Sequence, residues 1–267
     1  MKQIISIYKE FFTAYGLQGW WPLSGLNKSV GKNDRDWQNY IKVIKGHASD
    51  FKKNWPRHLG IAPKNSKEKF EIITGAILTQ NTSWNNVERA LYNLNKHKIN
   101  TLSEIKNLDK ETLALLIKSA GYHNQKAERL KLIAAYFSER DLDKFFNKPF
   151  YELRKELLSL KGIGPETADS ILLYAGELSI FVIDSYTKRI FSRILGKKTE
   201  KLKDYDDWQK IFMDAFFEEE NKVNIFKEYH GLIVRHGKEF CRTNPLCKDC
   251  FLKFYCFCGR IEADLRE

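Results

Sequence analysis

The first 240 residues of this chain contain no cysteine, and its five cysteines lie together between Cys241 and Cys258. The disulfide framework of a secreted protein spreads its cysteines along the chain, so this distribution argues against one. The chain also has no apolar run long enough to cross a membrane. Its N-terminal stretch interrupts apolar residues with Lys9 and Glu10, which predicts an amphipathic helix rather than a signal peptide. We therefore expect a cytoplasmic protein with no membrane partner.

Acidic residues are in the minority among the charged residues. The chain has 45 Lys and Arg against 34 Asp and Glu, which leaves a net charge of +11. An excess of this size points to a polyanion partner, most often nucleic acid, and a solubilising surface is the alternative. Hydrophobic residues make up 43% of the 267 residues, which is enough for a core and excludes overall disorder.

Alternation of apolar and polar residues is rare, and the short LSIFVID segment at 178–184 is the best strand candidate. Apolar residues instead recur at helical spacing, beginning within 70–94. Further predicted helices cover 110–119, 125–138, 149–160, 165–176, 185–195, 206–219 and 222–236. The chain is therefore predicted to be all-α. The stretch 23–66 is interpreted as an insertion or an elaborated connection, with helix-like pieces around 36–53 and a breaker at Pro56.

The segment ELLSL-KGIG-PETADSILLYA is the most specific pattern in the chain. An apolar helix is predicted to end at Leu160, and Pro165 opens the next helix, where its missing N–H costs nothing. Two glycines between them allow a sharp turn whose exposed N–H groups suit a phosphate oxygen. A plain connector between two helices is the alternative. The residues of this predicted DNA-binding turn are Lys161, Gly162, Ile163 and Gly164.

The full pattern L-x-G-I-G-x-x-T-A resembles the helix-hairpin-helix of the endonuclease III superfamily of DNA glycosylases. In that superfamily an Asp follows the hairpin, after an apolar segment and at the start of a helix. Asp184 in FVID-SYTKRIFSRIL occupies the matching position, and the resemblance implies that it is the catalytic residue. A fixed carboxylate stabilises an oxocarbenium-like sugar and orients or deprotonates water. The ordinary role of such an Asp is that of an N-cap, and the two roles are compatible.

The lysine of the bifunctional glycosylases is missing from this chain. Those members carry it two residues after the second glycine of the hairpin, where its amine forms a Schiff base with the sugar and the strand is cut. Glu166 stands at that position here, and a carboxylate cannot form a Schiff base. The resemblance is therefore to the monofunctional glycosylases, which have no lyase activity.

The segment FEIITGAILTQNTSW at 70–84 also resembles the superfamily. The resemblance implies that the turn formed by Gln80, Asn81 and Thr82 meets the DNA at the lesion. It also implies that a Gln in this turn fills the gap left by an extruded base. Capping of the next helix by Thr82 or Ser83 is the alternative.

Trp20 and Trp21, followed by Pro22, combine with the QNT turn and with GYHNQKAERL at 121–130 into a further resemblance. This combination is similar to the 3-methyladenine DNA glycosylase III branch. It implies that Trp20, Trp21 and Trp84 stack on the extruded base, and Lys238 is a further candidate for that pocket. A methylated purine is cationic, and aromatic faces favour cations. A buried Trp pair and a surface lysine are the ordinary alternatives.

The spacing Cys241-x5-Cys247-x2-Cys250-x5-Cys256 nearly matches the cluster loop of endonuclease III, whose first spacing is one residue longer. The resemblance implies that these four cysteines ligate a [4Fe-4S] cluster. A four-cysteine zinc site is the alternative, although such a site commonly pairs two CxxC units and this chain has one. Cys258 is either free or an alternative to Cys256.

The resemblance implies two helical domains, with the helix-hairpin-helix in 67–184 and the cluster loop in 185–267. Residues 1–66 are expected to pack with the C-terminal domain, and Asp184 is expected at the edge of a cleft between the domains. The expected function is that of a monomeric glycosylase of base excision repair, acting on an alkylated purine such as 3-methyladenine in double-stranded DNA. A glycosylase for oxidised or mismatched bases and a non-catalytic DNA-structure binding module are the alternatives.

Overall fold

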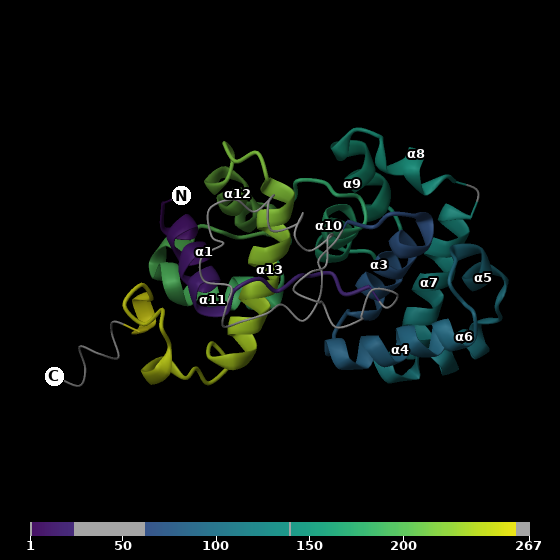
Figure 1. Cartoon of the computed structure of the whole chain (residues 1–267), viewed down its shortest axis with the longest axis horizontal. Helices are drawn as coiled ribbons and strands as arrows, with labels where there is room; N and C mark the ends of the chain where they lie inside the picture. Colours follow the sequence, from purple (N-terminus) through teal and green to yellow (C-terminus); the bar gives the residue numbers. More distant parts are fainter. Residues whose placement is uncertain (1, 24–61, 139, 260–267) are drawn as a thin grey trace, which may run out of the picture. The chain divides into compact units, whose positions relative to one another are not determined.

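The computed structural model describes residues 2–23, 62–138 and 140–259 (Figure 1). Within these ranges the regular structure is helical and no strand occurs, which confirms the all-α prediction. No helix of the described residues is long and apolar enough to cross a membrane. The predicted helical pieces around 36–53 and the breaker at Pro56 lie outside the described residues. The described chain divides into two compact units, one of residues up to Pro22 and from Ser179 onward, the other of 62–178 with Leu23.

The unit of residues 62–178 is built around one buried helix. Its helices are α3 (Ser66–Leu78), α4 (Trp84–Lys96), α5 (Leu102–Asn107), α6 (Lys110–Leu116), η3 (Lys118–Ala120), α7 (His123–Phe137), α8 (Leu142–Phe146), α9 (Phe150–Leu158) and α10 (Pro165–Tyr174). Helix α3 contacts α4, α7, α8 and α10. Every residue of α3 from Ile72 to Leu78 is buried, as expected for a helix that is apolar on all sides. The buried helix α3 therefore helps to position the turn that follows it and, through its contact with α10, the hairpin that precedes α10.

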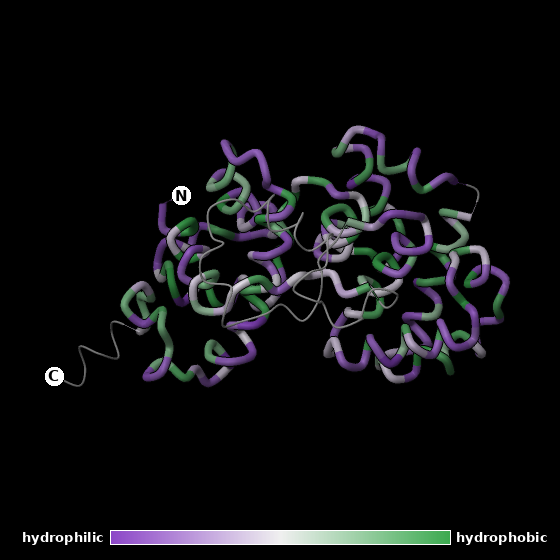
Figure 2. The backbone as a smooth tube through the Cα atoms, viewed as in Figure 1, coloured by the Kyte–Doolittle hydropathy of each residue, from purple (hydrophilic) through white to green (hydrophobic). Residues whose placement is uncertain are grey.

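The other unit joins the two ends of the chain. Its helices are α1 (Lys2–Tyr15), α11 (Ser185–Leu195), η4 (Gly196–Thr199), α12 (Tyr205–Ala215), α13 (Lys222–Glu239) and η5 (Cys247–Asp249). The predicted amphipathic N-terminal helix is α1, which contacts α12 and α13. Tyr229 of α13 is fully buried, and its ring lies 5.0 Å from that of Tyr8 and 5.7 Å from that of Phe181. Figure 2 shows hydrophobic and hydrophilic residues alternating along the helices of both units.

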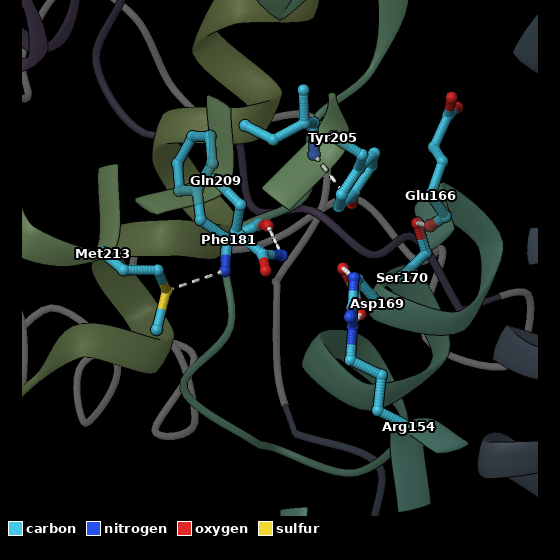
Figure 3. Close-up of polar contacts among 9 residues, drawn as sticks. Arg154, Glu166, Asp169, Ser170, Phe181, Tyr205, Gln209 and Met213 are labelled. Carbon is cyan, nitrogen blue, oxygen red and sulfur yellow. Dashed lines mark hydrogen bonds and ion pairs between the residues drawn. The ribbon is translucent and has the colours of Figure 1, made fainter. Parts of the chain in front are cut away.

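The LSIFVID segment is extended but pairs with no strand among the described residues. Its polar backbone groups are instead satisfied by side chains of α12 (Figure 3). The N–H of Phe181 donates to Sδ of Met213 at 3.3 Å, and Nε2 of Gln209 donates to the Phe181 carbonyl at 2.7 Å. The N–H of Ile183 donates to the Tyr205 hydroxyl at 3.1 Å. A helix therefore takes the place of a partner strand and holds the segment that leads into α11.

Candidate active site and DNA-binding elements

Asp184 is a buried carboxylate at the N-terminus of α11. Its Oδ1 accepts hydrogen bonds from the N–H of Thr187 at 2.6 Å and from the Thr187 hydroxyl at 2.7 Å. Its Oδ2 lies 3.6 Å from Nε2 of His230. Burial raises the pKa of Asp184, but the interactions with His230 and Thr187 outweigh it and hold the pKa below the ordinary 3.8. The carboxylate is therefore ionised at neutral pH, with one oxygen occupied by the helix cap and the other next to His230.

Helix α13 contributes two further side chains near Asp184, those of His230 and Lys238. His230 comes from its middle and carries no motif that singles it out in the sequence, because it reaches Asp184 only through the packing of α13 on α11. Lys238 is solvent-exposed, yet partial desolvation of its ammonium lowers its pKa, against the opposing effect of Asp184. The structure thus brings the predicted residues Lys238 and Asp184 within electrostatic range of each other.

Trp20 and Trp21 follow α1 in the same unit as Asp184. Their rings meet edge to face with centroids 5.9 Å apart, and Trp21 is buried whereas Trp20 is partly exposed. The predicted alternative of a buried Trp pair therefore describes Trp21 better than Trp20. Trp84, the third predicted aromatic residue, is the first residue of α4 in the other unit and is buried.

The turn between α3 and α4 is tied to the hairpin by the side chain of Gln80. Its Nε2 donates to the carbonyl oxygen of Gly162 at 3.1 Å and to the hydroxyl of Thr167 at 2.9 Å. Its Oε1 accepts a hydrogen bond from the guanidinium of Arg129. Asn81 follows with a φ of 53° and an exposed side chain. The structure therefore brings the predicted turn and the predicted hairpin together within one unit.

The alternative role of this turn, capping of the next helix, is supported only by the position of Ser83. Ser83 is the N-cap residue of α4, but its side chain makes no capping hydrogen bond. The hydroxyl of Thr82 instead accepts a hydrogen bond from Nδ2 of Asn86 at 3.2 Å. The polar side chains of the turn are thus only partly used to start the helix.

The predicted hairpin lies between α9 and α10, and its two glycines differ. Gly162 has a φ of 86°, and a Cβ added there would lie 2.5 Å from Nε of Arg129. Gly164 has an extended φ of −92°, and a Cβ there would meet nothing within 4 Å. Only Gly162 therefore needs glycine for the turn itself. Ile163 is buried as the predicted anchor, and Lys161 is exposed, with its Nζ 3.3 Å from Glu128.

Two acidic residues of α10 have different surroundings (Figure 3). Asp169 is fully buried and forms an ion pair with Arg154, whose Nε lies 2.9 Å from Oδ1, so it joins the two helices of the hairpin. Glu166 is exposed in the first turn, where its carbonyl accepts a hydrogen bond from the Ser170 hydroxyl at 2.7 Å. Its carboxylate complements the positive end of the helix dipole.

The comparison with protein families decides what this set of elements is. Residues 74–216 match the HhH-GPD superfamily of base excision DNA repair proteins. This chain belongs to that superfamily. The matched range contains the Gln80 turn, the hairpin and Asp184, and it ends before the cysteine loop.

Individual relatives of this HhH-GPD protein extend over more of the chain. A protein of Methanocaldococcus jannaschii, provisionally named a DNA repair glycosylase, is 38% identical over 260 residues and covers 96% of each chain. The endonuclease III of Sulfolobus acidocaldarius is 31% identical over 195 residues, covering 72% of this chain and 82% of that one. The structure of the Helicobacter pylori 3-methyladenine DNA glycosylase MagIII bound to 1,N6-ethenoadenine is similar with a TM-score of 0.58 and 30% identity. It covers 76% of this chain and 97% of the other.

The cysteine loop of this HhH-GPD protein surrounds a cavity. All five cysteines line it, together with the apolar side chains of Ile190, Ile194 and Leu252. Among the described residues no group of three or more His, Cys, Asp or Glu is arranged to hold a single metal ion. The thiols thus line a cavity rather than converge on one point.

The thiols around this cavity influence one another. Burial, together with the smaller effect of the neighbouring thiols of Cys241, Cys256 and Cys247, raises the pKa of Cys250 to about 11, against a backbone hydrogen bond that lowers it. Ligand cysteines bind metal as thiolates, and a cation offsets this mutual repulsion. Arg193 of α11 donates a hydrogen bond to Sγ of Cys241 at 3.2 Å. The donor set therefore fits a metal cluster bound by several thiolates.

Proposed function

We propose that this protein is a monofunctional DNA glycosylase that hydrolyses the N-glycosidic bond of an alkylated purine, such as 3-methyladenine, in duplex DNA. The observation that carries the proposal is the buried carboxylate of Asp184, which the N–H and hydroxyl of Thr187 hold at the N-terminus of α11. Breaking the glycosidic bond builds positive charge on the sugar, and a fixed carboxylate in a low-dielectric site stabilises that charge. Thr187 occupies Oδ1, so Oδ2 is the oxygen that faces the sugar cation or the attacking water.

The absence of lyase activity is inferred from Glu166. The bifunctional relatives use a lysine at this position, and here a carboxylate stands in the first turn of α10. Hydrolysis by water then leaves an intact abasic site, and no covalent bond forms between protein and DNA. Lys238 is the amine that would serve instead if this inference is wrong, because it lies within electrostatic range of Asp184.

The choice of an alkylated purine rests on the aromatic residues. N3-methyladenine carries a positive charge, and an aromatic face attracts a cation. Its glycosidic bond is already weakened by that charge, so a carboxylate without a strong general acid suffices. The similarity to the H. pylori 3-methyladenine glycosylase supports this choice. Trp20, Trp21 and Trp84 are the proposed stacking residues, and Lys238 is a further proposed contact of the base.

The DNA is proposed to be held mainly through phosphate contacts. Lys161 and the N–H groups of Gly162 and Gly164 suit a phosphate oxygen in any sequence, whereas the N–H of Ile163 already donates to the Leu160 carbonyl at 3.0 Å. Asn81 and Thr82 of the neighbouring turn are proposed to meet the DNA at the lesion. Flipping the base costs a few kcal/mol, and the cost is lower for a damaged base. The net charge of +11 predicts that binding weakens steeply with salt.

The cysteine loop is proposed to hold a [4Fe-4S] cluster on Cys241, Cys247, Cys250 and Cys256. The cluster would supply crosslinks to a loop that has few buried apolar residues of its own, and no chemical step is assigned to it. Arg193 donates to Sγ of Cys241 and to the carbonyl oxygens of Arg242 and Thr243, at 2.6 and 2.9 Å. It thereby fixes the start of the loop on α11.

A base-release assay on methylated duplex DNA, with chromatography of the freed bases, tests the proposal. We expect 3-methyladenine among the products, an unbroken strand until alkali is added, and no adduct trapped by borohydride. An efficiently trapped adduct that disappears in Lys238→Gln would overturn the monofunctional assignment. Release of an oxidised pyrimidine or a mismatched thymine, with no methylated purine, would keep the glycosylase and replace the lesion.

A further inference from the structure

We infer that Glu228 is a positioning residue that holds the Trp20–Trp21 segment for the flipped base, an inference that rests on the proposed function. Glu228 lies on α13 and is fully buried. Its Oε2 accepts a hydrogen bond from the N–H of Gln18 at 2.7 Å, and its Oε1 accepts one from the N–H of Gly19 at 2.9 Å. Both oxygens of one buried carboxylate therefore bind the two residues that directly precede Trp20.

The local backbone is shaped to make this contact. Gly19 has a φ of 66°, and such a left-handed residue lets consecutive N–H groups converge on one anion. A buried carboxylate is costly without donors, and hydrogen bonds to an ionised acceptor are stronger than neutral ones. The side chain of Gln18 adds a bond from its Nε2 to the Gly16 carbonyl at 2.9 Å. The segment is thus anchored at its backbone.

A second position on α13 meets the same segment. A Cβ added to Gly231 would lie 3.2 Å from Cβ of Gln18 and 3.6 Å from Cβ of Trp20. Glu228 and Gly231 are three residues apart and so share a face of the helix. His230, whose Nε2 is 3.6 Å from Asp184, lies between them. One helix therefore sets both the aromatic segment and the neighbour of the proposed catalytic carboxylate.

The functional consequence is a fixed spacing between the stacked base and the carboxylate that acts on its sugar. A displacement of reacting groups by 1 Å costs up to about 100-fold in rate. Glu228 touches neither base nor sugar in this scheme and acts only through Trp20 and Trp21. Its loss should therefore affect the damaged base and leave contacts to undamaged duplex, which belong to the hairpin, as they are.

Three variants of the full-length protein separate this role from a general structural one. Glu228→Gln keeps the shape but replaces one acceptor oxygen by an NH2 group, so that one of the two backbone bonds is lost. Gly231→Ala leaves the carboxylate intact and presses on Gln18 from the helix side. Glu239→Gln is the matched control, because it makes the same change on the same helix at an exposed residue paired with Arg235 at 2.9 Å.

The measurements are KM and kcat for base release, quenching of Trp fluorescence by free 3-methyladenine, affinity for undamaged duplex, and thermal stability. We expect Glu228→Gln and Gly231→Ala each to lower the affinity for the free base, measured by quenching, by about 10- to 100-fold. The rate of base release should fall by about the same factor. The affinity for undamaged duplex should match that of Glu239→Gln. Release and quenching equal to the control in both variants would overturn the inference. So would a uniform loss in which undamaged-duplex affinity and thermal stability fall in step with release.

Failure of the proposed lesion is distinguishable from failure of this inference. If the wild-type protein releases a different base and no methylated purine, the proposed lesion is wrong. The same variants are then compared on the base that is released, with that free base as the quencher. A selective loss in Glu228→Gln and Gly231→Ala would still support the positioning role, and its absence would still overturn it.

Discussion

Two helices of this protein begin in opposite ways. Helix α10 starts after Gly164, which is exposed and offers no side-chain cap, and Pro165 follows at the first helical position. Helix α11 starts after Asp184, which is buried and fills the N-terminus with its own carboxylate. Both ends carry the positive pole of a helix dipole. In α10 no side chain caps that pole, so its N–H groups suit an external anion, whereas in α11 it stabilises the carboxylate of Asp184.

This difference suits the start of α10 to DNA binding and the start of α11 to base release. An N-terminus that begins after a glycine and carries no side-chain cap suits a phosphate oxygen, which carries no sequence information. A closed N-terminus fixes the carboxylate oxygen and keeps it ionised in a buried place, which is what a developing sugar cation requires. Changes at α11 are therefore expected to act on base release, and changes at α10 on DNA affinity.

The largest expected effect comes from Asp184→Asn. Asparagine caps a helix nearly as well as aspartate, so the fold is kept, but the negative charge is lost. Base release should fall by about 100-fold or more, the scale seen when one transition-state charge partner is removed. Single-turnover release and duplex affinity are the measurements. The pKa of Asp184 in the folded protein is held below the ordinary 3.8. The stability that its ionised form contributes is therefore present above pH 3.8 and is lost as the pH falls through the lowered pKa of the folded state.

The matched control is Asp204→Asn at the N-cap of α12. Asp204 is exposed and forms a capping box with Asp207, so the substitution makes the same chemical change at another helix start in the same unit. It should leave base release at the wild-type rate. Equal losses in the two variants would mean that Asp184 serves only as a cap, and the contrast between α10 and α11 would lose its functional meaning.

The next largest expected effect concerns the cysteine loop, which is hydrogen-bonded to side chains of α11. Arg189 and Arg193 of that helix donate to the carbonyl and to Sγ of Cys241, at 2.9 and 3.2 Å. Cys250→Ala should abolish iron binding and lower the thermal stability of the unit, because the loop loses its crosslinks. Iron analysis and the visible absorption spectrum measure this. Cys258→Ser is the control and should keep four irons, following the four-cysteine ligand count. Stoichiometric zinc without iron after anaerobic purification would contradict the cluster.

Local patterns predicted much of this arrangement. The apolar stretch before Asp184 and the polar SYT after it already predict an extended segment followed by a capped helix. The KGIG sequence before Pro165 likewise predicts the hairpin, because glycine and proline act through their own backbone. The exposure of Glu166 follows from its place in a first helical turn. In each case the structure depends on residues close in the chain.

Other parts of the site depend on contacts between distant segments. Nothing near Gln80 in sequence predicts that Arg129 and Gly162 bind its side chain. Glu228 and His230 belong to an amphipathic helix whose pattern predicts burial but not the partner of each buried polar group. The sequence pattern also does not distinguish the two hairpin glycines, of which only Gly162 has a positive φ. Such details depend on how α7 packs within its own unit and how α13 packs within the other unit, and local sequence patterns do not describe this packing.

The hairpin glycines sharpen the contrast at the α10 end. Gly162→Ala forces a left-handed conformation, which costs about 1–2 kcal/mol, and places a Cβ against Arg129. The free energy of unfolding should fall accordingly. Gly164→Ala meets nothing within 4 Å, so stability should stay within about 0.5 kcal/mol. Its affinity for any duplex should still fall by about tenfold, or 1.4 kcal/mol, because the Cβ obstructs a phosphate. Unchanged affinity in Gly164→Ala would show that no phosphate comes close to this helix start.

The smallest expected effect comes from Gln80→Ala. Gln80 is partly exposed, and its side chain bonds to Arg129, Thr167 and the Gly162 carbonyl. Its removal should cost about 1 kcal/mol of unfolding free energy, the net value of one typical hydrogen bond, because water replaces the lost partners at this half-exposed side chain. Because the side chain braces the hairpin, affinity for undamaged and damaged duplex should fall alike. Chemical denaturation and equilibrium binding to both duplexes measure these effects.

Gln125→Ala, at an exposed glutamine of α7, is the control for Gln80→Ala and should change neither stability nor affinity. The two roles of Gln80 give different results. A side chain that fills the gap left by an extruded base is needed only at a lesion, so its loss would weaken binding to damaged duplex and spare the undamaged one. A side chain that braces the hairpin is needed for both. A selective loss at the lesion, with unchanged stability, would therefore show that Gln80 leaves its three partners when DNA binds.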